Sequence, residues 1–136
     1  MQARSPGEPV EKMYFLLNGL FHVVHIAIII FAITGWMFPP LRMAHLALML
    51  ATLGSWFILG HWLGSGYCPV SDWHWKIKAA LGEGRPRGTY IHLLLQRISG
   101  KELDSTSVDR MVVIVTIILT GISLGLNIAT WNSWIV

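Results

Sequence analysis

The chain has 136 residues, of which 54% are hydrophobic and only 12% are charged, and its formal net charge is +3. An average soluble domain is about 45–50% apolar and about 25% charged, so this composition indicates an integral membrane protein of a single domain. The single cysteine, Cys68, excludes an internal disulfide, and the absence of a CxxCH motif excludes covalent c-type haem attachment.

Two long apolar runs follow a polar tail over residues 1–12, for which we expect a cytoplasmic position. The runs span Met13–Phe38 and Leu41–Leu63, and each is long enough for a helix to cross a bilayer, which takes about 20 residues. Pro39 and Pro40 separate the runs and end the first helix, because proline cannot donate the helical hydrogen bond. The first run is too long for the apolar part of a signal peptide, and no small-residue cleavage site follows, so we expect a retained span.

Residues 64–106 form the segment between the second and third apolar runs. The pattern predicts two short amphipathic helices that lie in the membrane interface, over Asp72–Leu81 and Thr89–Ser99. Ser71 is expected to cap the start of the first helix, and Gly100 to end the second.

The third apolar run, Ser107–Trp134, predicts a third span, and Thr106 with Asp109 has the spacing of a capping box at its start. The predicted fold is therefore all-α, with three transmembrane helices and one or two short interfacial helices between the second and third. Small residues allow close helix packing in lipid. The glycines expected to serve this packing are Gly54, Gly60, Gly121 and Gly125.

The basic residues are distributed asymmetrically between the two sides that three spans define. Of the ten Lys and Arg residues, only Arg42 falls on the side of the hairpin turn and the C-terminus. The positive-inside rule then predicts a bacterial inner-membrane protein with a cytoplasmic N-terminus and a periplasmic C-terminus. Basic residues beside interfacial helices favour anionic lipids as partners, rather than nucleic acid. The residues expected at the membrane interface are Trp36, Trp62, Trp73, Lys76, Lys78, Arg85, Arg87, Trp131 and Trp134.

The hairpin contains four of the six histidines, and a polar ring in hydrocarbon usually faces protein, water or a ligand. His22 and His25 share a helical stripe with Asn18, which we expect to face protein. In a hairpin centred on the two prolines, His45 lies about 13 Å in depth from His25, and His61 lies about 6 Å from the level of His22. His45 therefore cannot readily ligate the same cofactor as His25. His61 could share a cofactor with His22 only if the helices are tilted or offset.

These histidines admit three interpretations. They hydrogen-bond backbone carbonyls, hydroxyls or a partner subunit; or they take part in quinone binding, lipid binding or a proton relay; or they ligate haem b or a chlorophyll-type pigment through neutral imidazole. The candidate cofactor ligands are His22, His25 and His61, although no bound cofactor is the favoured expectation. Cys68 and His74 offer too few ligands for a zinc site, and we expect a loop cysteine and a surface histidine.

The order of motifs resembles an uncharacterised family of small bacterial membrane proteins, classed only as a domain of unknown function. The resemblance covers about residues 21–99, and within it His22 and His61 are additional, while the acidic position, Asp72, lies close to the Cys-Pro motif. It implies a membrane fold and no established activity. The matching positions are His25, His45, Cys68-Pro69-Val70 and Tyr90.

No Walker A loop, GxSxG elbow, HExxH motif or pair of carboxylates within the spans occurs, so the sequence does not indicate an enzyme. The favoured expectation is an accessory or structural subunit of a larger inner-membrane complex, which packs on other membrane subunits through small-residue faces and the amphipathic segment. The alternative is a haem- or pigment-binding redox subunit that works near a quinone. A third hypothesis is a lipid-handling protein with a lipid held between Trp73–Leu95 and the spans.

Overall fold

The chain forms a splayed bundle of three long helices, as a computed structural model describes it over residues 9–84 and 88–135. The side chains of residues 132–135 are not described. Within the described residues there is no strand, and three segments are long and apolar enough to cross a membrane. They are Pro9–Met37, Pro39–Leu63 and Ser105–Trp131. The expectation of an all-α protein with three membrane-spanning helices is confirmed.

The first two spans are joined by a tight turn built from two 3-10 segments. Helix α1 (Pro9–Thr34) continues into η1 (Gly35–Met37), and the prolines start η2 (Pro39–Leu41), which leads into helix α2 (Arg42–Gly54). Helix α1 is described from Pro9 onward, so it includes residues of the expected polar tail, and proline suits the first turn of a helix.

The second span changes its geometry near its end. A π-helical segment, η3 (Ser55–Leu59), interrupts it before the last turn, α3 (Gly60–Leu63). A π segment widens the helix locally. The Ser55 hydroxyl donates a 2.7 Å hydrogen bond to the carbonyl of Tyr67, which ties this segment to the loop that follows.

Two short helices follow the second span. Helix α4 (Pro69–Ala80) begins three residues earlier than expected, with Cys68 as its N-cap, so the expectation that Ser71 caps it is wrong. Proline at the first helical position explains the early start. Helix α5 (Tyr90–Ser99) is confirmed, with Gly100 in the left-handed conformation at its end.

The third span is helix α6 (Ser105–Ile135). The expected capping box is wrong, because Asp104 accepts hydrogen bonds from the Ser107 amide at 2.9 Å and the Ser107 hydroxyl at 2.6 Å. Asp109 instead accepts a 2.7 Å hydrogen bond from the Thr89 hydroxyl, which links α6 to the start of α5.

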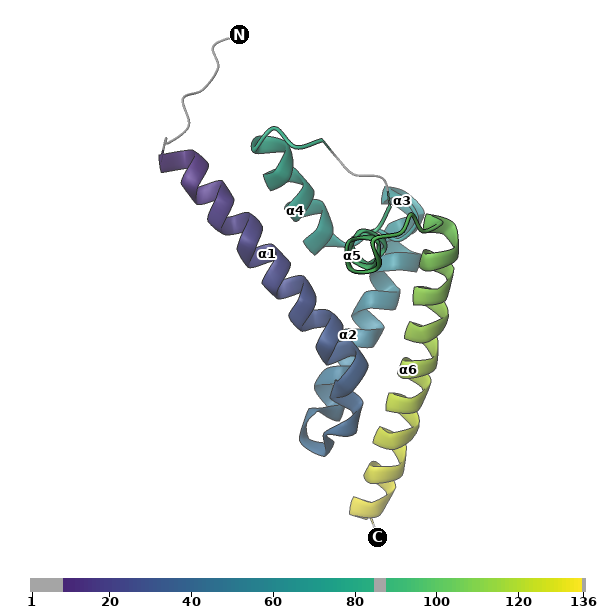
Figure 1. Ribbon diagram of the computed structural model, residues 1–136. Coiled ribbons are helices and arrows are strands. Elements are labelled where there is room, and N and C mark those ends of the chain that lie inside the picture. Colours follow the sequence, from purple (N-terminus) through teal and green to yellow (C-terminus); the bar gives the residue numbers. More distant parts are fainter. Residues whose placement is uncertain (1–8, 85–87, 136) are drawn as a thin grey trace.

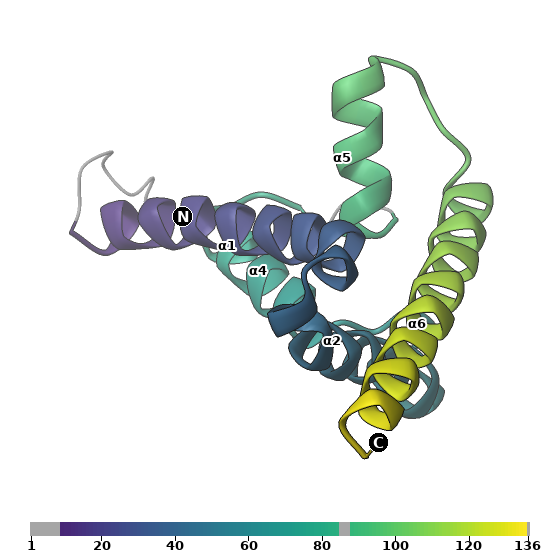
Figure 2. The ribbon, with the colours of Figure 1, turned by 90° about the horizontal axis from the view of Figure 1, so that it is seen from below.

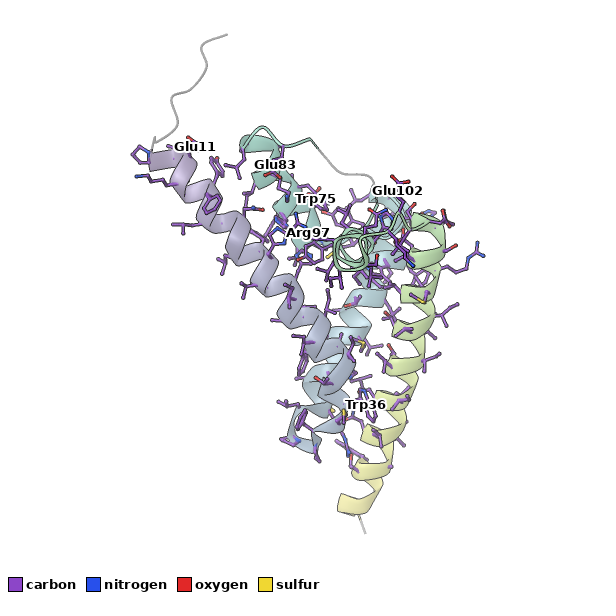
Figure 3. All side chains as sticks on the ribbon, viewed as in Figure 1. Glu11, Trp36, Trp75, Glu83, Arg97 and Glu102 are labelled. Atoms are coloured by element: carbon purple, nitrogen blue, oxygen red, sulfur yellow. The ribbon has the colours of Figure 1, made fainter. Side chains whose placement is uncertain are left out.

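The three long helices converge at one end and diverge at the other (Figure 1). The turn between α1 and α2 and the end of α6 lie at the narrow end. Helices α4 and α5 occupy the wide end, where α4 packs against α1, and α5 projects outward from between α1 and α6 (Figure 2). Figure 3 shows Trp75 and Arg97 at the wide end, and Trp36 near the narrow end.

Packing at the narrow end centres on His45, whose side chain is fully buried. Its Nε2–H donates to the carbonyl of Ala32 at 2.9 Å, and its Nδ1 accepts from the hydroxyl of Ser123 at 3.0 Å. One ring thereby joins α1, α2 and α6. Gly35 allows this close approach, because a Cβ added there would lie 2.9 Å from the Phe31 ring and 3.0 Å from the His45 ring.

We expect Gly35→Ala to destabilise the fold by roughly 1–3 kcal/mol, because a methyl group overpacks this contact. The measurement is the apparent melting temperature in a mild detergent. Gly19→Ala is the matched control, since a Cβ at Gly19 meets nothing within 4 Å. Equal melting temperatures for the two variants would contradict the close packing at Gly35.

Candidate ligand site at the wide end

Polar side chains of α1 meet α4 and α5 at the wide end and form a histidine cluster, made up of Asn18, His22, His25, His74 and Tyr90. The His25 ring stacks on the Tyr90 ring, with centroids 4.1 Å apart and planes at 17°. The His22 ring meets the His74 ring edge-on at 4.5 Å. The stripe of α1 that carries Asn18 and the two histidines faces protein, as its spacing predicted.

Hydrogen bonds within the histidine cluster connect three helices. The Nε2–H of His74 donates to Oδ1 of Asn18 at 2.7 Å and joins α4 to α1. The hydroxyl of Tyr90 is 2.9 Å from Nδ1 of His22 and joins α5 to α1. In a low-dielectric interior, such bonds offset the cost of burying each polar ring.

His25 has a partner on both ring nitrogens. Its Nδ1–H donates to the carbonyl of Phe21 at 3.1 Å, so that its Nε2 is an acceptor. The hydroxyl of Ser71 lies 3.0 Å from Nε2 and donates to it. His25 is therefore held in one orientation, with Nε2 directed toward the start of α4.

The expectation of a surface histidine at position 74 is wrong, because the His74 side chain is fully buried. Helix α4 turns His74 and Trp75 toward the bundle and leaves Trp73 59% exposed. Burial, followed by the nearby His22 and His25, lowers the pKa of His74 from 6.5 to about 4, so the ring is neutral at physiological pH. Its Nδ1 has no hydrogen-bond partner among the described residues.

Cys68 lies at the N-cap of α4, beside the histidine cluster. Burial by itself raises the pKa of the Cys68 thiol. The side chain of His25, which can share the thiol proton, and hydrogen bonds from Ser71 and Val70 outweigh burial and lower the pKa from 9.0 to about 7. A thiol at a helix N-terminus beside an imidazole is the usual setting of a reactive cysteine.

A cavity of about 930 Å³ opens beside the histidine cluster. His25, Cys68, Ser71 and Tyr90 line one part of it, and mostly apolar residues of the three spans, together with polar and charged residues at the wide end, line the rest. Its volume is within the range of small-molecule sites, about 300–1,000 Å³. The wide end thus combines a half-open cavity with polar groups of fixed orientation.

The structure separates the residues that the sequence proposed as cofactor ligands. His22 and His25 are neighbours, but His61 is exposed and makes its ring contact with Trp62, although it also lines the cavity. Within residues 9–84 and 88–135, no group of three or more His, Cys, Asp and Glu residues could hold a metal ion. The hydrogen bond between Nε2 of His25 and the Ser71 hydroxyl would have to break before Nε2 could ligate a metal.

Sequence reasoning missed the contributions of His74, Ser71 and Tyr90 to this site. A signal for His74 existed: a polar stripe on a membrane-spanning helix needs polar partners, and the amphipathic helix α4 offers them. The sequence indicated Tyr90 only as a position of the family motif. Its stacking on His25 depends on where α5 begins.

The structure describes most of the residues that the sequence places at the membrane interface. Lys76 pairs with Asp72 at 2.9 Å and Lys78 with Glu83 at 2.6 Å. Trp62 and Trp131 are exposed, and the indole of Trp36 donates to the carbonyl of Ile33. Arg85 and Arg87 lie outside the described residues, as does the side chain of Trp134. Contact of all these residues with lipid headgroups stays a prediction.

Of the four glycines expected in helix packing, Gly60 is buried against the backbone of Ser65 and Gly66. A Cβ at Gly121 or Gly125 would meet nothing within 4 Å, and one at Gly54 would meet only Ile58 of the same span. Packing through Gly54, Gly121 and Gly125 stays a prediction about contacts with another molecule.

The family model described as protein of unknown function, DUF2784, matches residues 15–127, so the chain belongs to this family. The resemblance to an uncharacterised family is thereby confirmed. The chain matches no curated protein and no solved structure. Three of the motif positions, His25, Cys68 and Tyr90, converge at the wide end, whereas His45 lies at the narrow end.

We expect the alkylation rate of Cys68 by iodoacetamide to rise with pH through a midpoint near 7, because the thiolate is the reactive form and the pKa of Cys68 is about 7. His25→Ala should move the midpoint up toward the ordinary value of about 8.5. The rate is measured by mass spectrometry on the single cysteine. His61→Ala, which lines the same cavity, is the control and should leave the midpoint in place; a shift of equal size in both variants would contradict the role of His25.

Proposed function

We propose that the chain is an accessory subunit of a larger membrane protein complex. The observation that supports this role is the small extent to which the spans cover one another. Only 6% of the most apolar stretch of the first span is buried inside the chain, and 17% in each of the other two. Much of the intramembrane surface is therefore left for lipid or other membrane subunits to cover.

The exposed face of α6 favours a protein partner for part of this surface. Gly121 and Gly125 lie one turn apart on that face, with no other side chain near them. Glycine at this spacing gives lipid little to contact, but it lets a second helix approach closely. The amphipathic segment adds a second docking surface, since Trp73 of α4 and Ile98 of α5 are 59% and 74% exposed.

The predicted partner should co-purify with the tagged chain at a fixed ratio from native membranes in mild detergent, as seen by native mass spectrometry. The double substitution Gly121→Leu, Gly125→Leu should release it, because the added side chains prevent close approach. Val115→Phe is the control, since Val115 is 45% exposed and lies about 120° around α6 from Gly121. A lone monomer in every mild detergent would count against the subunit role.

For the orientation, we propose a cytoplasmic wide end in a bacterial inner membrane. The wide end carries the start of α1, α4, α5 and the start of α6, to which nine of the ten basic residues belong or are adjacent in sequence. The narrow end carries the hairpin turn with Arg42. This charge distribution is the one that the positive-inside rule associates with the cytoplasmic side.

Alkaline phosphatase, which folds actively only outside the cytoplasm, tests this orientation. Fused after residue 136, it should be active in whole cells, and inserted after Gly84, between α4 and α5, it should be inactive. The reverse pattern of activities would overturn the orientation and leave the fold unaffected.

The alternative role, a redox subunit with haem b or a chlorophyll-type pigment, has weaker support. Both ring nitrogens of His25 are engaged, and Nδ1 of His22 is bonded to Tyr90. His61 is exposed and its ring contacts Trp62. A Soret band that His22→Ala or His25→Ala abolishes is the observation that would favour this alternative.

A further inference from the structure

The cavity at the wide end has an apolar wall at one end and a polar wall at the other, along the axis of the bundle. Its apolar part comes from the spans, and its polar part comes from the ends of helices at the wide end. A molecule that fills this space needs an apolar portion directed toward the middle of the membrane and a polar portion at the interface. The residues that define the two parts are Ile28, Met49 and Val113 on the apolar side, and Ser71, Asp109 and Arg110 on the polar side.

We propose that this cavity binds a phospholipid with a zwitterionic headgroup, whose phosphate meets Arg110 and whose ammonium meets Asp109. The acyl chains lie along the apolar wall, between α1, α2 and α6. This lipid site does not depend on the chain being a subunit of a complex.

The choice of a zwitterion follows from the charges in the cavity wall. Asp109 accepts a hydrogen bond from Thr89 at 2.7 Å, but neither Asp109 nor Arg110 forms an ion pair with any described residue. The third charged lining residue, Asp72, is paired with Lys76 at 2.9 Å. One carboxylate and one guanidinium thus remain for a ligand. An anionic headgroup would leave Asp109 unmatched, and a cationic one would leave Arg110 unmatched.

The choice of a lipid follows from the volume and position of the cavity. About 930 Å³ is more than a headgroup alone requires, and the walls extend along the spans as far as Ala32 and Met49. Asp109 and Arg110 lie in the first turns of α6, and Thr89 precedes α5, so the polar wall is at the depth where headgroups lie. The membrane supplies such a ligand at high local concentration.

The histidine cluster borders the headgroup end of the cavity with polar groups that already have partners in the chain. Both ring nitrogens of His25 are engaged, and the ring stacks on Tyr90, which also lines the cavity. Asp109 and Arg110, by contrast, form no ion pair with a described residue. Headgroup selection therefore rests on these two residues, and substitution of either one changes selection without removing the cluster.

The test uses the full chain in nanodiscs with equal amounts of phosphatidylethanolamine and phosphatidylglycerol, followed by native mass spectrometry. We expect one retained lipid, with phosphatidylethanolamine favoured about tenfold. Arg110→Gln and Asp109→Asn should each abolish this preference, whereas Lys101→Gln, an exposed basic residue outside the cavity wall, should preserve it. Retention of phosphatidylglycerol, of a non-lipid molecule or of no lipid by the folded wild-type chain would overturn the proposal.

Cys68 provides a second readout that does not depend on mass spectrometry, because it lines the same cavity. In detergent, diheptanoyl phosphatidylcholine should slow the reaction of Cys68 with N-ethylmaleimide about tenfold, and the anionic diheptanoyl phosphatidylglycerol should have a much smaller effect. Protection should be lost in Arg110→Gln. Equal protection by both lipids, or by neither, would contradict a zwitterion-selective site, and this outcome is independent of any partner subunit.

Discussion

The structure depends on one constraint: a polar ring buried in a membrane protein must find its hydrogen-bond partners within the protein. Each of His22, His25, His45 and His74 forms at least one such bond with a different helix or a backbone carbonyl, although Nδ1 of His74 is buried without a partner among the described residues. Leaving such a group unpaired in an apolar interior costs several kcal/mol on transfer scales. The histidines therefore act as specific contacts between helices whose apolar surfaces would pack against lipid equally well.

These contacts divide the molecule into two ends with different roles. At the narrow end, His45 joins α1, α2 and α6 through Ala32 and Ser123, and the helices lie close together. At the wide end, the histidine cluster holds α4 and α5 between helices that have diverged. Space remains between the spans there, and the cavity lies in it. The same kind of interaction thus closes one end of the bundle and keeps the other end open.

The chemistry of the wide end depends on the buried, uncharged ring of His74. Burial disfavours the charged form of His74, and its Nε2–H is committed to Asn18. The charged residues Asp72, Asp109 and Arg110 lie in the first turns of α4 and α6. Cys68 lies between these two regions, next to His25, so it can report both on the protonation of the cluster and on the occupancy of the cavity. A π-helical turn at Ser55 widens the second span beside this region and anchors the loop that carries Cys68.

The sequence by itself determined the three spans, because hydrophobic length and the two central prolines follow from local physics alone. It also determined that Asn18, His22 and His25 share one face of α1, since helical periodicity requires it. The separation of His45 from His25 followed from the rise per residue. Helix α5 could be placed because its apolar residues recur at helical spacing and Gly100 carries a local C-terminal capping signal.

Only the tertiary structure decided which face of α4 meets α1, and with it the burial of His74 and the position of Cys68 beside His25. Short amphipathic helices at a membrane interface can turn either face inward, and their own sequence cannot tell which. The tertiary structure also decided that Asp109 bonds to Thr89 and does not form a local capping box. This hydrogen bond forms because the start of α5 lies against α6. The hydrogen bonds that join the helices of the candidate site connect residues 46 to 68 positions apart, and such contacts have no local signal.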